Sequence, residues 1–180
     1  MKCISLSFFL WLSCSVSLAA PRGAVSQRDL EKAVTKLLGA DERILRLSDL
    51  EPDAKTEFES QKGSQGPGLV CVDTDDAKTA CGVLTVDKSG KNKSCRRFLV
   101  IGDVLSNSAK AEAVEDFRKD TAKRTNVFVV KWPKSKLQNR GQGPDTVEMK
   151  SDGISRVIEG QSNLVIFYDK GNLNKVSISD

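Results

Sequence analysis

Acidic side chains are the groups in this chain best suited to chemistry, because its 180 residues include no histidine. Without an imidazole, neither a Ser-His-Asp triad nor a Cys-His pair can form. Two groups of carboxylates could still supply the acid and base of glycoside hydrolysis. They are Asp73, Asp75 and Asp76, and Glu112, Glu115 and Asp116. Acids are also frequent in turns and in the first turn of helices, so we predict no catalytic residue and keep a secreted carboxylate-dependent hydrolase acting on glycans as an alternative.

The N-terminus predicts export from the cell. Lys2 precedes an apolar stretch, Ile4 to Val16, which is followed by small residues at the −3 and −1 positions of a cleavage site, Ser17 and Ala19. We therefore expect residues 1–19 to be a signal peptide. No later apolar run approaches the roughly 20 residues that a bilayer requires, so we expect a secreted, extracellular protein without membrane insertion.

Export would place the cysteines in an oxidising compartment, where disulfides form. Cys3 and Cys14 leave with the signal peptide, so one disulfide and one free thiol are expected among Cys71, Cys81 and Cys95. All three pairings are open from the sequence. We favour Cys71–Cys81, because two short strands are expected on either side of the turn between these residues. The spacing lacks the close pair typical of zinc sites, and we predict no metal and no cofactor.

Cys95 is then the candidate free thiol. It lies in a basic stretch, residues 91–97, whose cations would lower the pKa of the thiol. The alternatives are a reactive or intermolecularly paired thiol and a buried, inert side chain. The same stretch contains the sequon Asn92-Lys93-Ser94, which predicts N-glycosylation at Asn92 if the chain is exported.

A second basic stretch contains a tryptophan and is the best candidate for a partner-binding surface. Its members are Trp132, Lys131, Lys134, Lys136 and Arg140. A tryptophan among cations can anchor a protein interface, whereas the simpler alternative is a solvated loop whose indole covers the end of a sheet. Acids gather elsewhere, around residues 49–59 and 73–76, and this segregation favours an oriented contact with a protein. The net charge of +4 is too mild for a nucleic-acid-binding chain.

The clearest signal for secondary structure follows the predicted signal peptide. Ser26 can cap a helix, and apolar residues recur with helical spacing from Leu30 to Leu38. A helix is therefore predicted over residues 27–38, with Gly39 as its left-handed stop.

The chain before residue 69 is expected to lie apart from the main domain. Residues 44–47 are apolar but too few to assign to helix or strand. We interpret residues 20–50 as an N-terminal helical segment and residues 51–68, which contain two prolines and three glycines, as a flexible linker.

Residues 69–180 are predicted to form an α+β domain. Short apolar runs predict strands at residues 69–72, 81–86, 98–101, 127–130, 146–149, 154–158, 164–168 and 173–178. The run at 127–130 is almost continuous in β-branched residues and is expected in the centre of a sheet, and residues 131–143 are expected to be a polar loop. A tight hairpin turn is predicted over residues 169–172.

A second helix is predicted over residues 107–122, with Ala113, Val114, Phe117 and Thr121 on its inner face. Strands grouped together with segregated helices indicate an α+β fold. We expect a mainly antiparallel sheet of about six to eight strands with two helices.

With a signal peptide, a small domain, few cysteines and no catalytic signature, the sequence resembles the small secreted effector proteins that pathogenic fungi and other parasites export to act on a host. The resemblance implies a role in virulence through an extracellular or host protein. It extends to ribonuclease-fold effectors, for which the missing histidines would imply binding without catalysis. The leading hypothesis is a secreted non-enzymatic interaction protein of effector, inhibitor or ligand type. A small-ligand carrier with an apolar pocket between helix and sheet is a further alternative.

Overall fold

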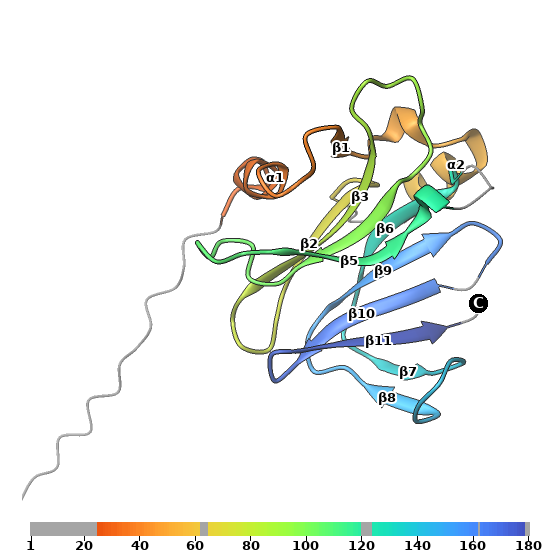
Figure 1. Ribbon diagram of the computed structural model, residues 1–180. Helices are drawn as coiled ribbons and strands as arrows, with labels where there is room; N and C mark the ends of the chain where they lie inside the picture. The colour runs from red at the N-terminus through yellow and green to blue at the C-terminus, as the bar shows by residue number, and fades with distance from the viewer. Residues whose placement is uncertain (1–24, 62–64, 120–123, 162, 179–180) are drawn as a thin grey trace, which may run out of the picture.

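The structure, a computed structural model, describes residues 25–61, 65–119, 124–161 and 163–178. In this part of the chain two helices accompany eleven strands, which form three antiparallel sheets (Figure 1). The predicted α+β class is confirmed, although the strands exceed the expected six to eight. The predicted signal peptide, with its two cysteines, lies outside the described residues.

The elements are named in chain order. The α-helices are α1 (Gln27–Thr35) and α2 (Pro52–Ser60), and the 3-10 helices are η1 (Leu47–Asp49) and η2 (Phe117–Lys119). The first strands are β1 (Glu42–Ile44), β2 (Leu69–Asp73), β3 (Thr79–Asp87), β4 (Arg97–Ile101) and β5 (Ala111–Asp116). The later strands are β6 (Val127–Trp132), β7 (Lys136–Gln138), β8 (Thr146–Glu148), β9 (Gly153–Ile158), β10 (Asn163–Asp169) and β11 (Asn172–Ile178).

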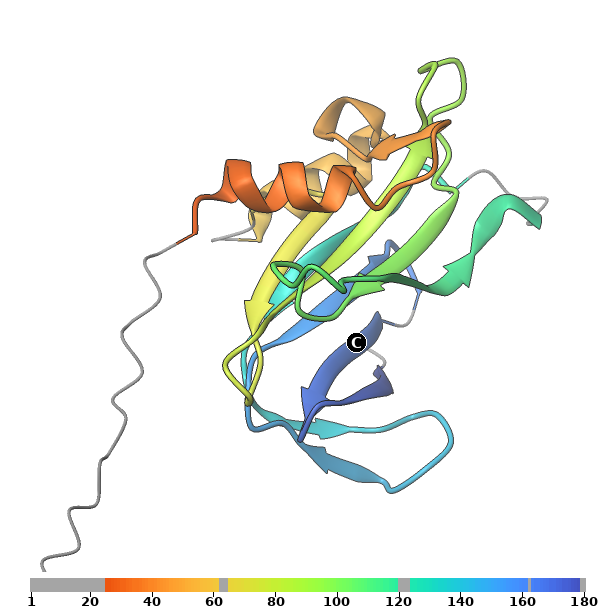
Figure 2. The same ribbon diagram turned by 60° about the vertical axis from the view of Figure 1, so that its left-hand side comes forward.

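Two large sheets pack against each other and enclose the main core (Figures 1 and 2). The first sheet has the order β1-β3-β4-β5, with β2 also paired to β3, and the second has the order β11-β10-β9-β6. Successive side chains of a strand point to opposite faces. On β3, Leu84 and Val86 accordingly join the core between the sheets, whereas Cys81 and Val83 join a second cluster on the outer face.

The helix α1 covers the outer face of the first sheet. As predicted, the Ser26 side chain caps it, accepting the Asp29 backbone N–H at 3.2 Å. Leu30 and Val34 are buried against the second cluster. The helix ends earlier than predicted, and Gly39 is not in the left-handed region. The two leucines at 37–38 instead form a turn and pack, partly buried, on the same cluster.

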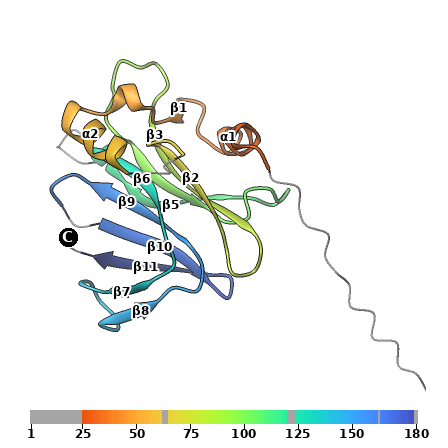
Figure 3. The same cartoon turned by 180° about the vertical axis from the view of Figure 1, so that it is seen from behind.

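The segment predicted to be a flexible linker contains α2, so that interpretation is wrong for residues 52–60. Pro52 stands in the first turn of the helix, where its missing N–H leaves no bond unmade. Ala54 and Phe58 lie four residues apart and are both buried. The Phe58 ring meets Phe128 of β6 edge-on, with 5.6 Å between centroids, and Figure 3 shows α2 beside β6.

The predicted helix over residues 107–122 is also wrong, because its described part consists of a short irregular stretch, residues 107–110, followed by β5 and η2. Residues 120–122 lie outside the described residues. Alanine and glutamate favour helices in isolation, but pairing with β4 overrides this weak local preference. The register with β4 shifts between Phe98 and Leu99, and this bulge disturbs the alternation that marks a strand.

The remaining differences concern the second sheet. The strand β6 lies at the end of this sheet, not at its centre, and is apolar because α2 covers one face and the first sheet the other. The predicted loop 131–143 contains β7, which pairs with β8.

The hairpin of β7 and β8 covers the outer face of the second sheet, where Leu137 and Met149 pack on Phe167. The turn at 169–172 is confirmed, with left-handed Lys170 and Gly171 between β10 and β11.

Gly82 allows the two large sheets to approach each other, since a Cβ built there would lie 2.4 Å from Ile154 Cγ2 of β9. We predict that Gly82→Ala lowers the free energy of unfolding by about 1–3 kcal/mol through overpacking. Gly66→Ala is the matched control, because a Cβ at that position meets no atom closer than 3.9 Å. Urea denaturation measures both effects, and equal stabilities of the two variants would contradict the close approach.

Candidate functional site

The disulfide Cys71–Cys81 joins β2 to β3 and confirms the predicted pairing. The two residues are direct partners in the antiparallel register. Both side chains are buried beneath α1, in the cluster that Leu30 and Val34 complete. The bond is therefore a structural link between strands and not an accessible redox centre.

Cys95 is free and buried, with 2 % of its surface exposed. Its thiol lies 3.7 Å from the Arg97 carbonyl oxygen, to which it donates. Burial raises the pKa of the Cys95 thiol far above its usual range, and the negative charge of Glu115 adds to this effect. The thiol therefore stays protonated at neutral pH, which argues against a reactive cysteine.

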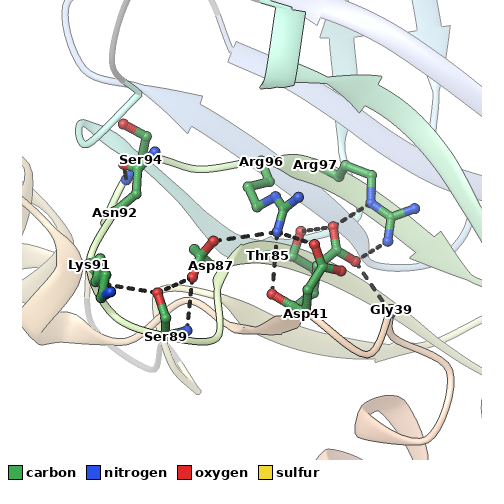
Figure 4. Close-up of polar contacts among 11 residues, drawn as sticks. Gly39, Asp41, Thr85, Asp87, Ser89, Lys91, Asn92, Ser94, Arg96 and Arg97 are labelled. Carbon is green, nitrogen blue, oxygen red and sulfur yellow. Dashed lines mark hydrogen bonds and ion pairs between the residues drawn. The ribbon is translucent and has the colours of Figure 1, made fainter.

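The two arginines that follow the free cysteine form ion pairs with acids near β1 (Figure 4). Arg97 Nε donates to Glu42 Oε1 at 2.7 Å, and a second guanidinium nitrogen bonds the other carboxylate oxygen. A guanidinium nitrogen of Arg96 lies 2.7 Å from Asp41 and 3.7 Å from Asp87. Since only 2 % of the Glu42 side chain is exposed, this cluster fastens β1 to its neighbours from within the fold.

A second buried ion pair closes the turn after β1. Arg43 donates two hydrogen bonds to the Asp49 carboxylate, at 2.6 and 2.8 Å, and the Arg46 backbone N–H donates a third at 2.8 Å. Burial alone would raise the pKa of Asp49, but these bonds outweigh it and lower the pKa. For Glu42, burial is likewise opposed and outweighed by Arg97, and the pKa of the carboxyl is lowered. Both acids are thus held as buried carboxylates.

These two pairs were not foreseen from the sequence. Glu42 and Arg97 are 55 residues apart along the chain, and local spacing gives no signal for such a contact. The basic stretch at 91–97 is consequently less basic on the surface than its sequence indicates, because its two arginines point to acids.

The first group of candidate carboxylates is not arranged for catalysis. Asp76 binds Lys78 and the Thr74 hydroxyl within the β2–β3 turn. Asp75 accepts the backbone N–H of Lys170 at 2.7 Å, which ties this turn to the one between β10 and β11. Both aspartates therefore serve the turns in which they lie.

Two members of the second group, Glu115 and Asp116, line a cleft on the side where β5 faces β9, whereas Glu112 is exposed on β5 outside it. The cleft has a volume of about 400 Å³, and its lining includes Glu115, Asp116, Arg124 and Arg156. Arg156 donates two hydrogen bonds to Glu115, at 2.8 and 2.7 Å, while Asp116 pairs with Arg118 at 2.5 Å. Glycoside hydrolysis needs one carboxyl group that can give up a proton to the leaving group. Carboxylates bound by guanidinium groups do not fit that role.

The predicted partner-binding residues do not form one compact patch. Lys131 and Trp132 end β6, and Lys134 lies in the next turn. Arg140 lies beyond β7, four residues past Lys136, which is about 13 Å of extended chain. The first three are neighbours in the chain, but the side chains of Lys131 and Trp132 point to opposite faces of β6. Arg140 lies beside β11, where its backbone N–H donates to the Ser177 carbonyl oxygen.

The indole of Trp132 is half-buried and packs on the apolar cluster beneath the β7–β8 hairpin. Its Nε1 donates to Ser135 Oγ at 3.1 Å. Asp152 pairs with Lys131 at 2.6 Å and accepts the Lys134 backbone N–H at 3.0 Å. Trp132 thus covers the sheet, as the simpler interpretation expects, while leaving part of the indole exposed.

Asn92 lies exposed in the loop between β3 and β4. Its side-chain oxygen accepts the Ser94 backbone N–H at 3.0 Å (Figure 4). The adjacent Lys93 donates from Nζ to the Ser48 carbonyl oxygen at 2.9 Å, which holds the base of the loop.

Comparison of the chain with protein-family models, with curated proteins and with solved structures gives no match. Within the described ranges, no helix has the length and apolar character needed to cross a bilayer. The same residues contain no group of three potential ligand side chains placed to hold a metal ion. What the protein does must therefore be inferred from its surface chemistry.

Arg97→Ala would leave the Glu42 carboxylate buried without its cation. We predict a loss of about 3–5 kcal/mol in the free energy of unfolding. In the control Arg118→Ala, an exposed ion pair is lost, and the loss of stability should be much smaller because solvent screens the pair. Urea denaturation at pH 7 compares the two variants, and similar losses would contradict the buried pair.

The same experiment has a pH dependence. The folded-state pKa values of Glu42 and Asp49 are lowered, so their stabilisation is complete above the unfolded values near about pH 4 and is lost as the pH falls below them. The difference in the free energy of unfolding between wild type and Arg97→Ala should therefore become smaller as the pH falls from 5 to 3.

Proposed function

We propose that this chain is a secreted, non-enzymatic protein that binds another macromolecule through the surface at the end of β6. The state of its reactive groups carries the proposal. Asp75, Asp76, Glu115 and Asp116 are each engaged in a turn or an ion pair, and Cys95 is buried. A general acid, base or nucleophile must reach its substrate, and these groups are not placed to do so.

The end of β6 has the features of a preorganised contact surface. The half-buried indole of Trp132 is fixed by packing and by Ser135, so little side-chain entropy remains to be lost on binding. Lys131 and Lys134 are exposed and near Trp132 in the chain, and the Lys131 side chain points to the opposite face of β6. Tryptophan is one of the residues most enriched in interface hot spots.

The partner that fits this surface is an extracellular or host protein with an acidic patch. Lys136 and Arg140 extend the positive charge along the β7–β8 hairpin, so the contact would be oriented by its charges. A host partner would support the effector role that the sequence resemblance implies.

We predict that the double variant Lys131→Glu/Lys134→Glu binds the partner at least about tenfold more weakly, mainly through slower association. The matched control is Lys88→Glu/Lys91→Glu, which makes the same change in net charge on the β3–β4 loop. The partner is captured with the secreted protein from its natural setting, and surface plasmon resonance then compares the variants. Equal affinities for the two double variants would overturn the proposed surface.

We further propose that Asn92 carries an N-linked glycan. The residue is exposed in a loop, and the predicted signal peptide would bring it to the glycosylation machinery. Expressed as the full chain in a eukaryotic secretory host, the protein should migrate faster after treatment with peptide N-glycosidase F. Asn92→Gln and Ser94→Ala should remove this shift, whereas Asn107→Gln, at an exposed asparagine outside any sequon, should retain it. Secretion without a shift would reject the glycan and leave export intact.

A further inference from the structure

A cavity of about 320 Å³ lies beside α1, on the opposite side of the sandwich from Trp132. One wall is a face of α1, formed by Gln27, Glu31 and Thr35 at intervals of four residues. The second wall is β1 with the turn after it, and the third is the segment 65–69. The volume falls at the lower end of the roughly 300–1,000 Å³ of small-molecule sites.

Packing on either side keeps this cavity from collapsing. The Gly68 backbone lies against Leu45, since a Cβ built at Gly68 would lie 2.2 Å from the Leu45 carbonyl oxygen, so the two segments that contain these residues cannot move closer. The helix is held on the outer face of the first sheet by Leu30 and Val34. Its N-terminal end is fixed by the bond from Gln27 Nε2 to the carbonyl oxygen of residue 65, at 2.9 Å.

The lining is mainly apolar. Most polar groups at its rim are hydrogen-bonded or ion-paired to other residues of the protein. The apolar lining residues are Ile44, Leu45, Leu47, Pro67 and Leu69. The Gln65 amide both donates to and accepts from the Cys71 backbone, at 3.0 Å each, and Arg43 is bound by Asp49. Glu31 and Arg46 add one charge of each sign, so the lining is electrically balanced.

We propose that this cavity binds a small, uncharged, apolar molecule. The balanced charges give a charged ligand no net attraction, whereas the half-buried side chains of Ile44 and Leu47 would gain from being covered. Since Thr35 Oγ1 and Gln27 Nε2 already donate to the carbonyl oxygens of Glu31 and residue 65, a single hydrogen-bond donor on the ligand can face the side-chain oxygens of Thr35 and Gln27 at the rim. The site is independent of the surface at the end of β6, and either can fail without the other.

The test uses the neutral fluorescent probe N-phenyl-1-naphthylamine and the purified, disulfide-bonded protein. Saturable binding with one site per chain is expected. Thr35→Trp and Gly66→Leu should weaken it at least about fivefold, because each adds bulk at a lining position. A Cβ at residue 66 meets only the Leu69 carbonyl oxygen, at 3.9 Å, so that variant should fold. The matched control is Leu105→Ser, which removes an exposed apolar side chain elsewhere and should leave the affinity unchanged.

Methyl NMR spectra of the wild-type protein test the proposal even if one variant is unstable. Addition of the probe to the wild-type protein should shift the methyl signals of Ile44 and Leu47 and leave those of Leu105 in place. Absence of saturable binding, wild-type affinity in both cavity variants, or probe-induced shifts confined to other residues would each overturn the proposal.

Discussion

The burial of β3 on both faces is the constraint on which the rest of the fold depends. Its residues from Ala80 to Val86 are all buried, and the strand pairs with β1, β2 and β4. A sheet that is apolar on both sides needs two covering layers, because each exposed face would leave apolar area in water. The second sheet covers one face and α1 the other. Gly82 sets how closely the second sheet approaches β3, and the disulfide lies beneath α1 on the other face.

The buried ion pairs stabilise the attachment of β1 to the rest of the fold. This strand has only three residues, and a short edge strand gains little from backbone pairing alone. Glu42 and Asp49 lie inside the fold, and each is bound by a guanidinium group that satisfies its oxygens. Removing one partner of such a pair is costly because the other stays buried. The ion pairs thereby also position the β1 wall of the cavity beside α1.

The two outer faces of the sandwich consequently differ in chemistry. At the β7–β8 hairpin, the half-buried indole of Trp132 packs on the outer face near the exposed Lys134, and this is the surface that we propose for a macromolecular partner. The face beside α1 holds a small apolar cavity with balanced charge. Between them, the cleft near β5 contains the ion pair of Glu115 and Arg156.

The sequence by itself determined the features that depend on neighbouring residues. The Ser26 cap, the start of α1, the β2–β3 hairpin and the turn at 169–172 all follow from local conformational preference. The α+β class and the pairing Cys71–Cys81 followed because turns fix which strands are adjacent.

Only the tertiary structure decided the features that depend on contacts between distant segments. The strand β5 forms from a sequence with helical preference because β4 supplies its backbone partners. The helix α2 forms in a segment with loop signals because Ala54 and Phe58 are buried, with Phe58 against Phe128 of β6. The half-burial of Trp132 and the pairing of Glu42 with Arg97, which are 55 residues apart, likewise depend on tertiary contacts. Burial and long-range pairing outweigh local preferences of less than about 1 kcal/mol per residue, and they cannot be read from spacing along the chain.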